Sequence, residues 1–183
     1  MGYSFFNRIL GIVSVAVFCF SCTNDVDFNQ VDEFNAQPVY TTNLAYFDLI
    51  ASDFIVNGTE QSVFSHVAVL DLFNSSFFDE NLVGADLFFK VNNTINRAYV
   101  LNMTFFDNQN QPLYNVNLSV PSYTGTDDTV TKTVVFDTTN LDVLKNSTKI
   151  NFVLIMLPGP PLTANSTGHI KLSSSVTAYL DIK

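Results

Sequence analysis

Two neighbouring segments of the chain alternate apolar and polar side chains with a period of two, the pattern of a half-buried β-strand. In the segment RAYVLNMTFFD, the apolar face consists of Tyr99, Leu101, Met103 and Phe105. In the segment LYNVNLSV, it consists of Tyr114, Val116, Leu118 and Val120. The polar stretch DNQNQP separates them, and its Asn and Pro residues favour a turn. The sequence therefore predicts an antiparallel hairpin over residues 99–120.

Further strands are expected throughout the rest of the chain. The last segment, HIKLSSSVTAYLDIK, alternates over its whole length and predicts a long, half-exposed strand. Shorter candidates are residues 44–51, 67–73, 85–91, 130–136 and 150–157. The segment TNLDVLKNS predicts one helical turn that crosses between sheets, and the proline-rich PGPPLTANSTG predicts a long exposed loop.

These patterns predict an all-β protein. About eight strands with polar turns between them favour a two-layer antiparallel β-sandwich, immunoglobulin-like and Greek-key in the broad sense. A closed barrel is the alternative. Residues 39–183 have the usual size of one domain, and we expect a single β-sandwich domain there. The composition agrees, because the chain contains no Trp yet is rich in Phe, Val, Thr, Tyr and Asn, which are strand and turn residues.

Residues 1–21 predict a secretory signal peptide. Ile9 to Phe20 form an apolar run preceded by Arg8, the only formally charged side chain before it, and followed by the small residue Ser21. The run is shorter than the roughly 20 apolar residues that a transmembrane helix needs. A buried helix of the fold is the alternative.

The four residues CFSC resemble the lipobox of bacterial lipoproteins, in which a small residue precedes the cysteine that is lipidated. The resemblance implies that Cys22 carries the acyl chains, palmitate among them, and becomes the mature N-terminus. Cys19 and Phe20 depart from the usual lipobox residues. Cys19 would leave with the signal peptide, so no thiol would remain for a disulfide or a metal site. Two or three acyl chains anchor a protein to a membrane stably.

Residues 22–38 are acidic and polar and predict a flexible tether. Their acids are Asp25, Asp27, Asp32 and Glu33. The stretch resembles the acidic segment that directs some lipoproteins of Bacteroidota to the cell surface, and the chain as a whole resembles a small lipoprotein of that group. This resemblance implies an outer-membrane location, at the cell surface or, as the alternative, on the periplasmic face.

The charge of the chain argues against nucleic acid as a partner. The sequence has 17 acidic and 8 basic side chains, which gives a formal net charge of −9. Removal of the signal peptide takes away Arg8 and makes the mature chain more acidic. Such a chain is repelled by phosphate backbones and by anionic lipid headgroups.

The sequence nominates no catalytic residue, no metal site and no cofactor. His66 and His169 are the only histidines, each is expected near the end of a strand, and neither has the spacing of a zinc motif. The usual hydrolase and nucleotide-binding motifs are absent. Asp127 and Asp128 could bind calcium, but a solvated turn is the simpler interpretation because the EF-hand pattern is missing.

Two tripeptides match the O-glycosylation motif of exported Bacteroidota proteins, in which Asp precedes Ser or Thr and then an aliphatic residue or Thr. They are Asp128-Thr129-Val130 and Asp137-Thr138-Thr139. The resemblance implies that Thr129 and Thr138 are glycan acceptors.

Three functions remain open. The first is a lipid-anchored envelope module that binds or scaffolds another envelope component and performs no catalysis. The second is a glycan-binding accessory lipoprotein of a polysaccharide-uptake system, whose candidate stacking residues are Tyr40, Tyr46, Tyr99, Tyr114 and Tyr123. The third is an enzyme, which a cluster of His66 or His169 with a carboxylate and a hydroxyl would support. The sequence predicts no oligomeric state.

Overall fold

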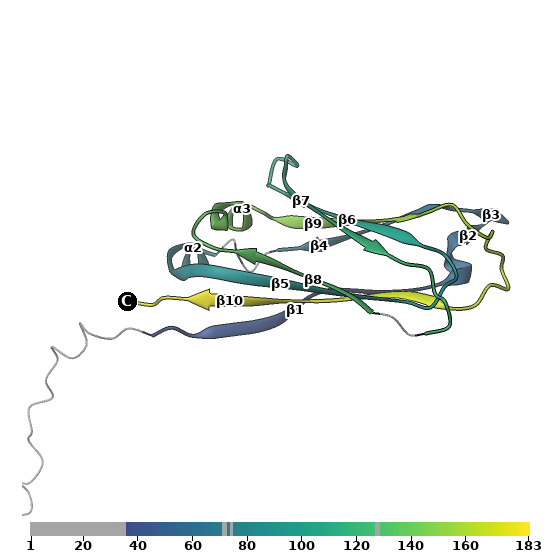
Figure 1. Ribbon diagram of the computed structural model, residues 1–183. Helices are drawn as coiled ribbons and strands as arrows, with labels where there is room; N and C mark the ends of the chain where they lie inside the picture. Colours follow the sequence, from purple (N-terminus) through teal and green to yellow (C-terminus); the bar gives the residue numbers. More distant parts are fainter. Residues whose placement is uncertain (1–35, 71–72, 74, 127–128) are drawn as a thin grey trace, which may run out of the picture. The chain divides into compact units, whose positions relative to one another are not determined.

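The computed structural model describes residues 36–70, 73, 75–126 and 129–183. Within these residues, eight long strands form two antiparallel four-stranded sheets that pack face to face (Figure 1). The first sheet has the order β1 (Val39–Ile50), β10 (His169–Leu180), β5 (Leu82–Asn93) and β8 (Thr129–Phe136). The second has the order β4 (Val63–Val69), β9 (Lys149–Met156), β6 (Tyr99–Phe106) and β7 (Pro112–Val120). The predicted two-layer β-sandwich is confirmed.

The strand order is that of a jelly roll. Among the eight long strands of the described residues, only β6 and β7 are both consecutive in sequence and adjacent in a sheet. Every other connection crosses from one sheet to the other, which produces two Greek keys. The order differs from the seven-strand immunoglobulin arrangement. The immunoglobulin-like description therefore holds only in the broad sense of a Greek-key sandwich.

The predicted hairpin is confirmed, since β6 pairs with β7 and Tyr99 lies opposite Val120. The strand predicted at 67–73 is wrong in its bounds, because β4 begins at Val63 and ends at Val69. Apolar residues occupy both faces of this segment, and they conceal its period. His66 consequently lies in the middle of β4 and not at its start.

Short elements connect the sheets. The predicted helical turn is α3 (Leu141–Lys145), which joins β8 of the first sheet to β9 of the second. A second helix, α2 (Ser76–Asn81), precedes β5, and Phe78 N–H donates to its N-cap, Ser75 Oγ. Between β1 and β4 lie a 3₁₀ turn, η2 (Ala51–Phe54), and a small hairpin of β2 (Ile55–Val56) and β3 (Thr59–Glu60).

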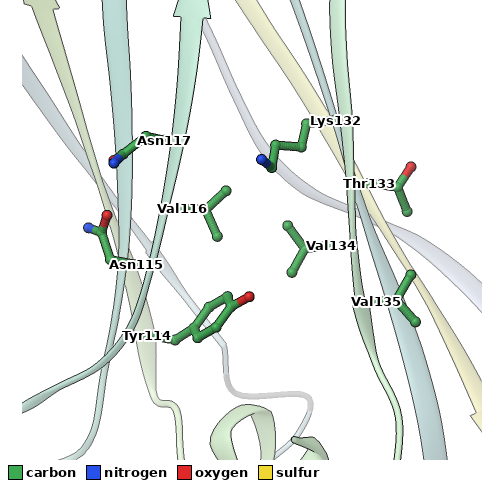
Figure 2. Close-up of a pocket in the computed structure, with 8 residues that line it drawn as sticks. All are labelled: Tyr114, Asn115, Val116, Asn117, Lys132, Thr133, Val134 and Val135. Carbon is green, nitrogen blue, oxygen red and sulfur yellow. The ribbon is translucent and has the colours of Figure 1, made fainter.

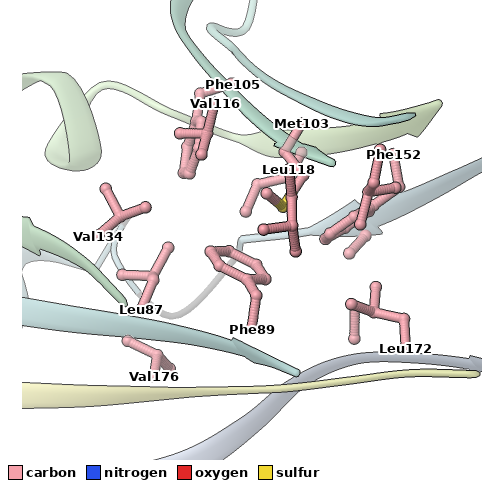
Figure 3. Packing of buried hydrophobic residues seen from close by; sticks show 14 of the residues in the cluster. Leu87, Phe89, Met103, Phe105, Val116, Leu118, Val134, Phe152, Leu172 and Val176 are labelled. Carbon is pink, nitrogen blue, oxygen red and sulfur yellow. The ribbon is translucent and has the colours of Figure 1, made fainter. Parts of the chain in front are cut away.

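The core lies between the two sheets and is rich in phenylalanine (Figure 3). Rings from opposite sheets meet there edge to face. Phe89 and Phe152 have ring centroids 6.2 Å apart, and Phe105 and Phe136 have centroids 5.7 Å apart. Each fully buried side chain of this size contributes about 1.5–3 kcal/mol through the hydrophobic effect. The alternating apolar positions of the sequence supply this core directly.

The described domain begins slightly before the predicted boundary at residue 39. Ala36 forms an isolated β-bridge with Ile182, and Leu180 N–H donates to Pro38 O at 3.1 Å. The last three residues of the predicted tether are therefore fixed to the margin of the first sheet. The signal peptide predicted at 1–21 and residues 22–35 of the tether lie outside the described residues. No helix in the described part of the chain has the length and apolar character needed to cross a bilayer.

Candidate binding surface

The side of the first sheet that faces away from the second sheet is polar, and we call it the outer face. Its positions follow from the alternation of side chains along each strand. On the two central strands these positions are His169, Lys171, Ser173, Ser175, Thr177 and Tyr179 of β10, and Asp86, Phe88, Lys90 and Asn92 of β5. Hydroxyl, amide and charged groups thus cover most of this surface.

The outer face contains a hollow of about 400 Å³. Its lining residues are Lys90, Asn92, Thr129, Lys171 and Ser173. The strand register brings them together, because Lys171 lies opposite Asn92 and Ser173 lies opposite Lys90. Asn92 in turn lies opposite Thr129 at the start of β8. Three strands that are far apart in sequence therefore build one polar depression that carries two lysines.

A second hollow, of about 290 Å³, adjoins the first. Its lining residues are Asn43, Ala45, Tyr46, Ser173 and Ser174, so Ser173 borders both hollows. The pairing of β1 with β10 is irregular between Asn43 and Tyr46, as in a β-bulge. Bulges on edge strands re-aim side chains, and here the side chain that follows the bulge is Tyr46.

The buried hydroxyl of Ser174 stabilises this bulge. Ala45 N–H donates to Ser174 Oγ at 2.9 Å, and Ser174 O–H donates to Ala45 O at 2.9 Å. The two backbone groups that lose their partners in the irregular ladder are thereby satisfied. These two hydrogen bonds explain why a serine interrupts the apolar face of β10. The sequence pattern alone gives no reason for a serine at this position.

Charged groups meet at one end of the outer face. Lys171 Nζ lies 3.0 Å from Asp48 Oδ2, and His169 Nδ1 lies 3.4 Å from Asp48 Oδ1. The hydrogen bond with Asp48 is the main reason that the pKa of Lys171 is raised. Lys90 forms no ion pair or side-chain hydrogen bond within the described residues. Among the described residues, the first hollow therefore contains one lysine with a carboxylate partner and one without.

The two histidines form no hydrolytic cluster in the described residues. His169 contacts the Asp48 carboxylate, but the nearby Tyr46 hydroxyl donates to Asp48 at 3.4 Å and not to the imidazole. His66 is half-buried, and its ring packs against Phe47 and Phe152 with centroid distances of 6.2 and 6.4 Å. His169 begins β10, in agreement with the sequence interpretation.

The remaining sequence-based candidates are dispersed. Thr129 is exposed and lines the first hollow, whereas Thr138 is exposed in the turn after β8. Cys22, Asp127 and Asp128 lie outside the described residues. Within the described ranges, no three His, Cys, Asp or Glu side chains are grouped so as to hold a metal ion.

The five candidate tyrosines occupy different environments. Tyr46 is 58% exposed on the outer face, and Tyr40 is 52% exposed near the start of β1. Tyr99 is fully buried and Tyr123 is half-buried. Tyr114 packs against Phe105 and Phe136 at the sandwich edge. Tyr114 is 37% exposed and lines the groove between β7 and β8, whereas Tyr46 has the more exposed ring and borders a hollow of the outer face.

A groove of about 430 Å³ runs between the edge strands β7 and β8 (Figure 2). Val116 and Val134 form its apolar floor, Tyr114 lies at one end, and Lys132 comes from β8. Lys132 occupies the core-facing phase of β8, two residues before Val134. An inward-pointing lysine on an edge strand disfavours pairing with another chain. We therefore interpret this groove as a protected edge of the sandwich.

Comparisons with known proteins give neighbours of similar fold and no family. No family model matches the sequence, and no curated protein is significantly similar to it. Among solved structures, the VP2 subviral particle of infectious bursal disease virus shares 11% identity, over 78% of this chain and 32% of that chain, with a TM-score of 0.47. A Parabacteroides distasonis protein predicted to be secreted shares 14% identity, over 63% and 37% of the two chains, with a TM-score of 0.43.

A third neighbour is the enzymatically active domain of tailspike protein 4 of bacteriophage CBA120, with 9% identity and a TM-score of 0.37. The match covers 78% of this chain and 19% of the tailspike chain. The chain thus spans well under half of each of these three proteins. At these values the likenesses carry no inference about ligand or activity, because one fold supports many functions.

Proposed function

We propose that this protein is a lipid-anchored module of the cell envelope that binds a ligand on its outer face and does not transform it. The observation that carries the proposal is the pair of adjoining polar hollows beside the exposed Tyr46 ring. A rigid two-sheet scaffold positions these side chains by strand register. Such a surface offers hydrogen bonds and a flat ring, which are the means of recognition in a binding module.

The anchor of this module is Cys22, through its acyl chains, and the membrane is the outer membrane. The lipobox-like CFSC and the acidic residues after it support this location, with the cell surface favoured over the periplasmic face.

Intact mass of the membrane-extracted protein, with protease treatment of whole cells, tests the anchor. We expect a mass equal to residues 22–183 plus acyl chains, and cleavage on intact cells. The Cys22→Ala variant should lack the added mass and appear in the soluble fraction. An unlipidated natural product would contradict the anchor, and protection until the outer membrane is opened would contradict the surface location.

A saccharide is the ligand class that the outer face favours, which makes a glycan-binding accessory lipoprotein the second candidate function. Sugar rings stack on exposed aromatic side chains, and their hydroxyl groups bond to Ser, Thr and Asn side chains. Tyr46, Ser173 and Asn43 supply these groups around one hollow. An envelope protein is the alternative partner for the same face.

A glycan array with Tyr46→Ala and Tyr40→Ala variants tests this candidate. We expect the natural chain to bind a subset of saccharides, Tyr46→Ala to lose the binding and Tyr40→Ala to keep it, because both tyrosines are exposed but only Tyr46 borders a hollow. The bound saccharides should keep their mass during long incubation. Cleaved products would contradict the absence of catalysis, and equal loss in both variants would remove the role of Tyr46.

A further inference from the structure

Basic side chains are scarce in this protein, yet two of them line one hollow. The whole sequence has 8 Lys and Arg against 17 Asp and Glu. Lys90 and Lys171 both border the hollow of about 400 Å³, and none of its described lining residues is acidic. The Asp48 carboxylate contacts Lys171 from the neighbouring strand β1. Stability alone does not account for this arrangement, because like charges on neighbouring strands repel each other and only Lys171 has a carboxylate partner among the described residues.

The register places the two ammonium groups so that one anion can reach both. Lys171 lies opposite Asn92, so Lys90 is its diagonal neighbour on the same face. Diagonal neighbours in an antiparallel pair are about 7–8 Å apart at the backbone, within reach of two long flexible side chains that converge on one group. Asn92 and Thr129 lie on the same floor and add polar groups.

The same strands connect this cationic hollow to the exposed ring of Tyr46. Tyr46 of β1 lies opposite Ser173 of β10, and Ser173 lies opposite Lys90 of β5. Tyr46 and Lys90 are thus two strand spacings apart, about 10 Å, which is the length of about two linked sugar rings. Because Ser173 borders both hollows, the surface between the ring and the lysine is continuous.

We infer that the two hollows form one site for an acidic saccharide. The carboxylate or sulfate of one sugar lies between Lys90 and Lys171, and the neighbouring sugar ring lies against Tyr46. This inference rests on the proposed function of the outer face as a ligand surface, and it adds the chemical class of the ligand. The net negative charge of the chain does not oppose it, because surface charges farther than about 8 Å from the site are largely screened at physiological ionic strength.

Titration of the mature chain (residues 22–183, with Cys22→Ala to avoid lipid) tests the inference. The probes are a galacturonic acid oligomer, its methyl ester and a sulfated oligosaccharide of similar length. Lys90→Gln is the main variant, since Lys90 has no described ion-pair partner whose release would complicate the result. Lys132→Gln is the matched control, because it removes the same charge from the β7–β8 groove.

We expect an acidic probe to bind and Lys90→Gln to weaken its binding about tenfold, the effect of losing one charge-assisted hydrogen bond. Lys132→Gln should leave the binding unchanged. The carboxylate and sulfate probes distinguish the two sources of negative charge. Equal binding of the acid and its methyl ester would overturn this inference and leave saccharide binding intact. Absence of binding by all probes and by neutral glycans would overturn both.

Discussion

The phenol of Tyr99 is an unusual residue in the core. Its side chain is fully buried, and its hydroxyl finds no hydrogen-bond partner within the described residues. Burial raises the pKa of this phenol well above its usual range. A buried hydroxyl without a partner costs free energy on folding, because it loses its hydrogen bonds to water.

Tyr99→Phe is therefore expected to leave the free energy of unfolding unchanged or to raise it by up to about 1 kcal/mol. Most core substitutions act in the opposite direction. Denaturant unfolding of both proteins measures the difference. A loss of more than about 1 kcal/mol would show that the hydroxyl has a partner, such as a buried water, that stabilises the fold.

The carboxylate of Asp137 is held by the turn that follows β8. Thr139 donates to Asp137 Oδ1 through its hydroxyl at 2.6 Å and its backbone N–H at 2.9 Å. These bonds, the hydroxyl first, lower the pKa of Asp137 below its ordinary value of 3.8. Because the pKa is lowered, the charged carboxylate stabilises the folded state at pH values above the ordinary pKa. This contribution is lost as the pH falls through the lowered pKa.

Thr139→Val removes the hydroxyl and keeps the backbone bond, so we expect the pKa of Asp137 to rise part of the way towards its ordinary value. Titration of the Asp137 carboxyl carbon by NMR in both proteins measures the change. Thr138→Val, on the neighbouring exposed residue, serves as the control. An unchanged pKa in Thr139→Val would show that the backbone N–H alone holds the carboxylate.

Among the connecting elements, the proline-rich loop after β9 is held by one buried arginine. Arg97 donates to Glu60 Oε1 at 3.1 Å, to Leu157 O at 3.0 Å and to Pro160 O at 2.5 Å. Leu162 N–H donates to the same Glu60 oxygen at 2.7 Å. Arg97 thus joins the loop after β9 to the β2–β3 hairpin. The loop is largely exposed, as its composition predicts, but its first residues are anchored.

Arg97→Gln should destabilise the protein by about 2–3 kcal/mol, less than the loss for a fully buried pair because the Glu60 side chain is 30% exposed. Amide hydrogen exchange should become faster at residues 157–162 in particular. Lys149→Gln, on an exposed pair with Asn110, is the control and should change neither quantity much. Unchanged exchange in the loop would contradict the anchoring role of Arg97.

The connection into β10 depends on a glycine. Gly168 has a φ of +100°, and a Cβ atom there would lie 2.3 Å from Thr94 O. Gly168 O also accepts a hydrogen bond from Ala51 N–H at 2.9 Å. The next residue, His169, begins the strand that carries Lys171 and Ser173. The position of the outer face therefore depends on this close approach of two backbones.

Gly168→Ala is expected to lower the free energy of unfolding by about 3 kcal/mol or more, because the unfavourable φ and the backbone clash both destabilise the folded state. Gly125→Ala separates the two effects, since Gly125 has a similar φ of +102° but open space around its Cβ position. We expect it to cost about 1–2 kcal/mol. Thermal or denaturant unfolding measures both variants. Equal losses of unfolding free energy in Gly168→Ala and Gly125→Ala would show that the backbone near Thr94 moves away without cost.

For the molecule as a whole, the sequence predicts the layers well and the order of strands poorly. Period-two alternation located β6, β7 and β10, because each has one buried and one exposed face. It misplaced β4, where valines occupy the exposed face. Strand order depends on contacts between distant segments, which local patterns do not contain.

The candidate binding surface could be predicted from the sequence only in part, for the same reason. Alternation indicates that Lys171 and Ser173 face away from the core, and Tyr46 and Lys90 can be assigned to exposed positions in the same way. Their proximity depends on the pairing of β10 with both β1 and β5. The bulge in β1 and the serine that stabilises it also have no signature in the sequence. A binding surface built from side chains of three strands can therefore be identified only in the structure.

In the proposed function, the outer face of the β1–β10–β5–β8 sheet binds the ligand. NMR mapping of backbone amides in the ¹⁵N-labelled mature chain, during addition of the saccharide that binds best on the array, tests this claim. We predict that the shifts cluster at Tyr46, Lys90, Lys171 and Ser173. Shifts centred on the β7–β8 groove at Tyr114 and Lys132, or on the outward side of the second sheet, would contradict the claim.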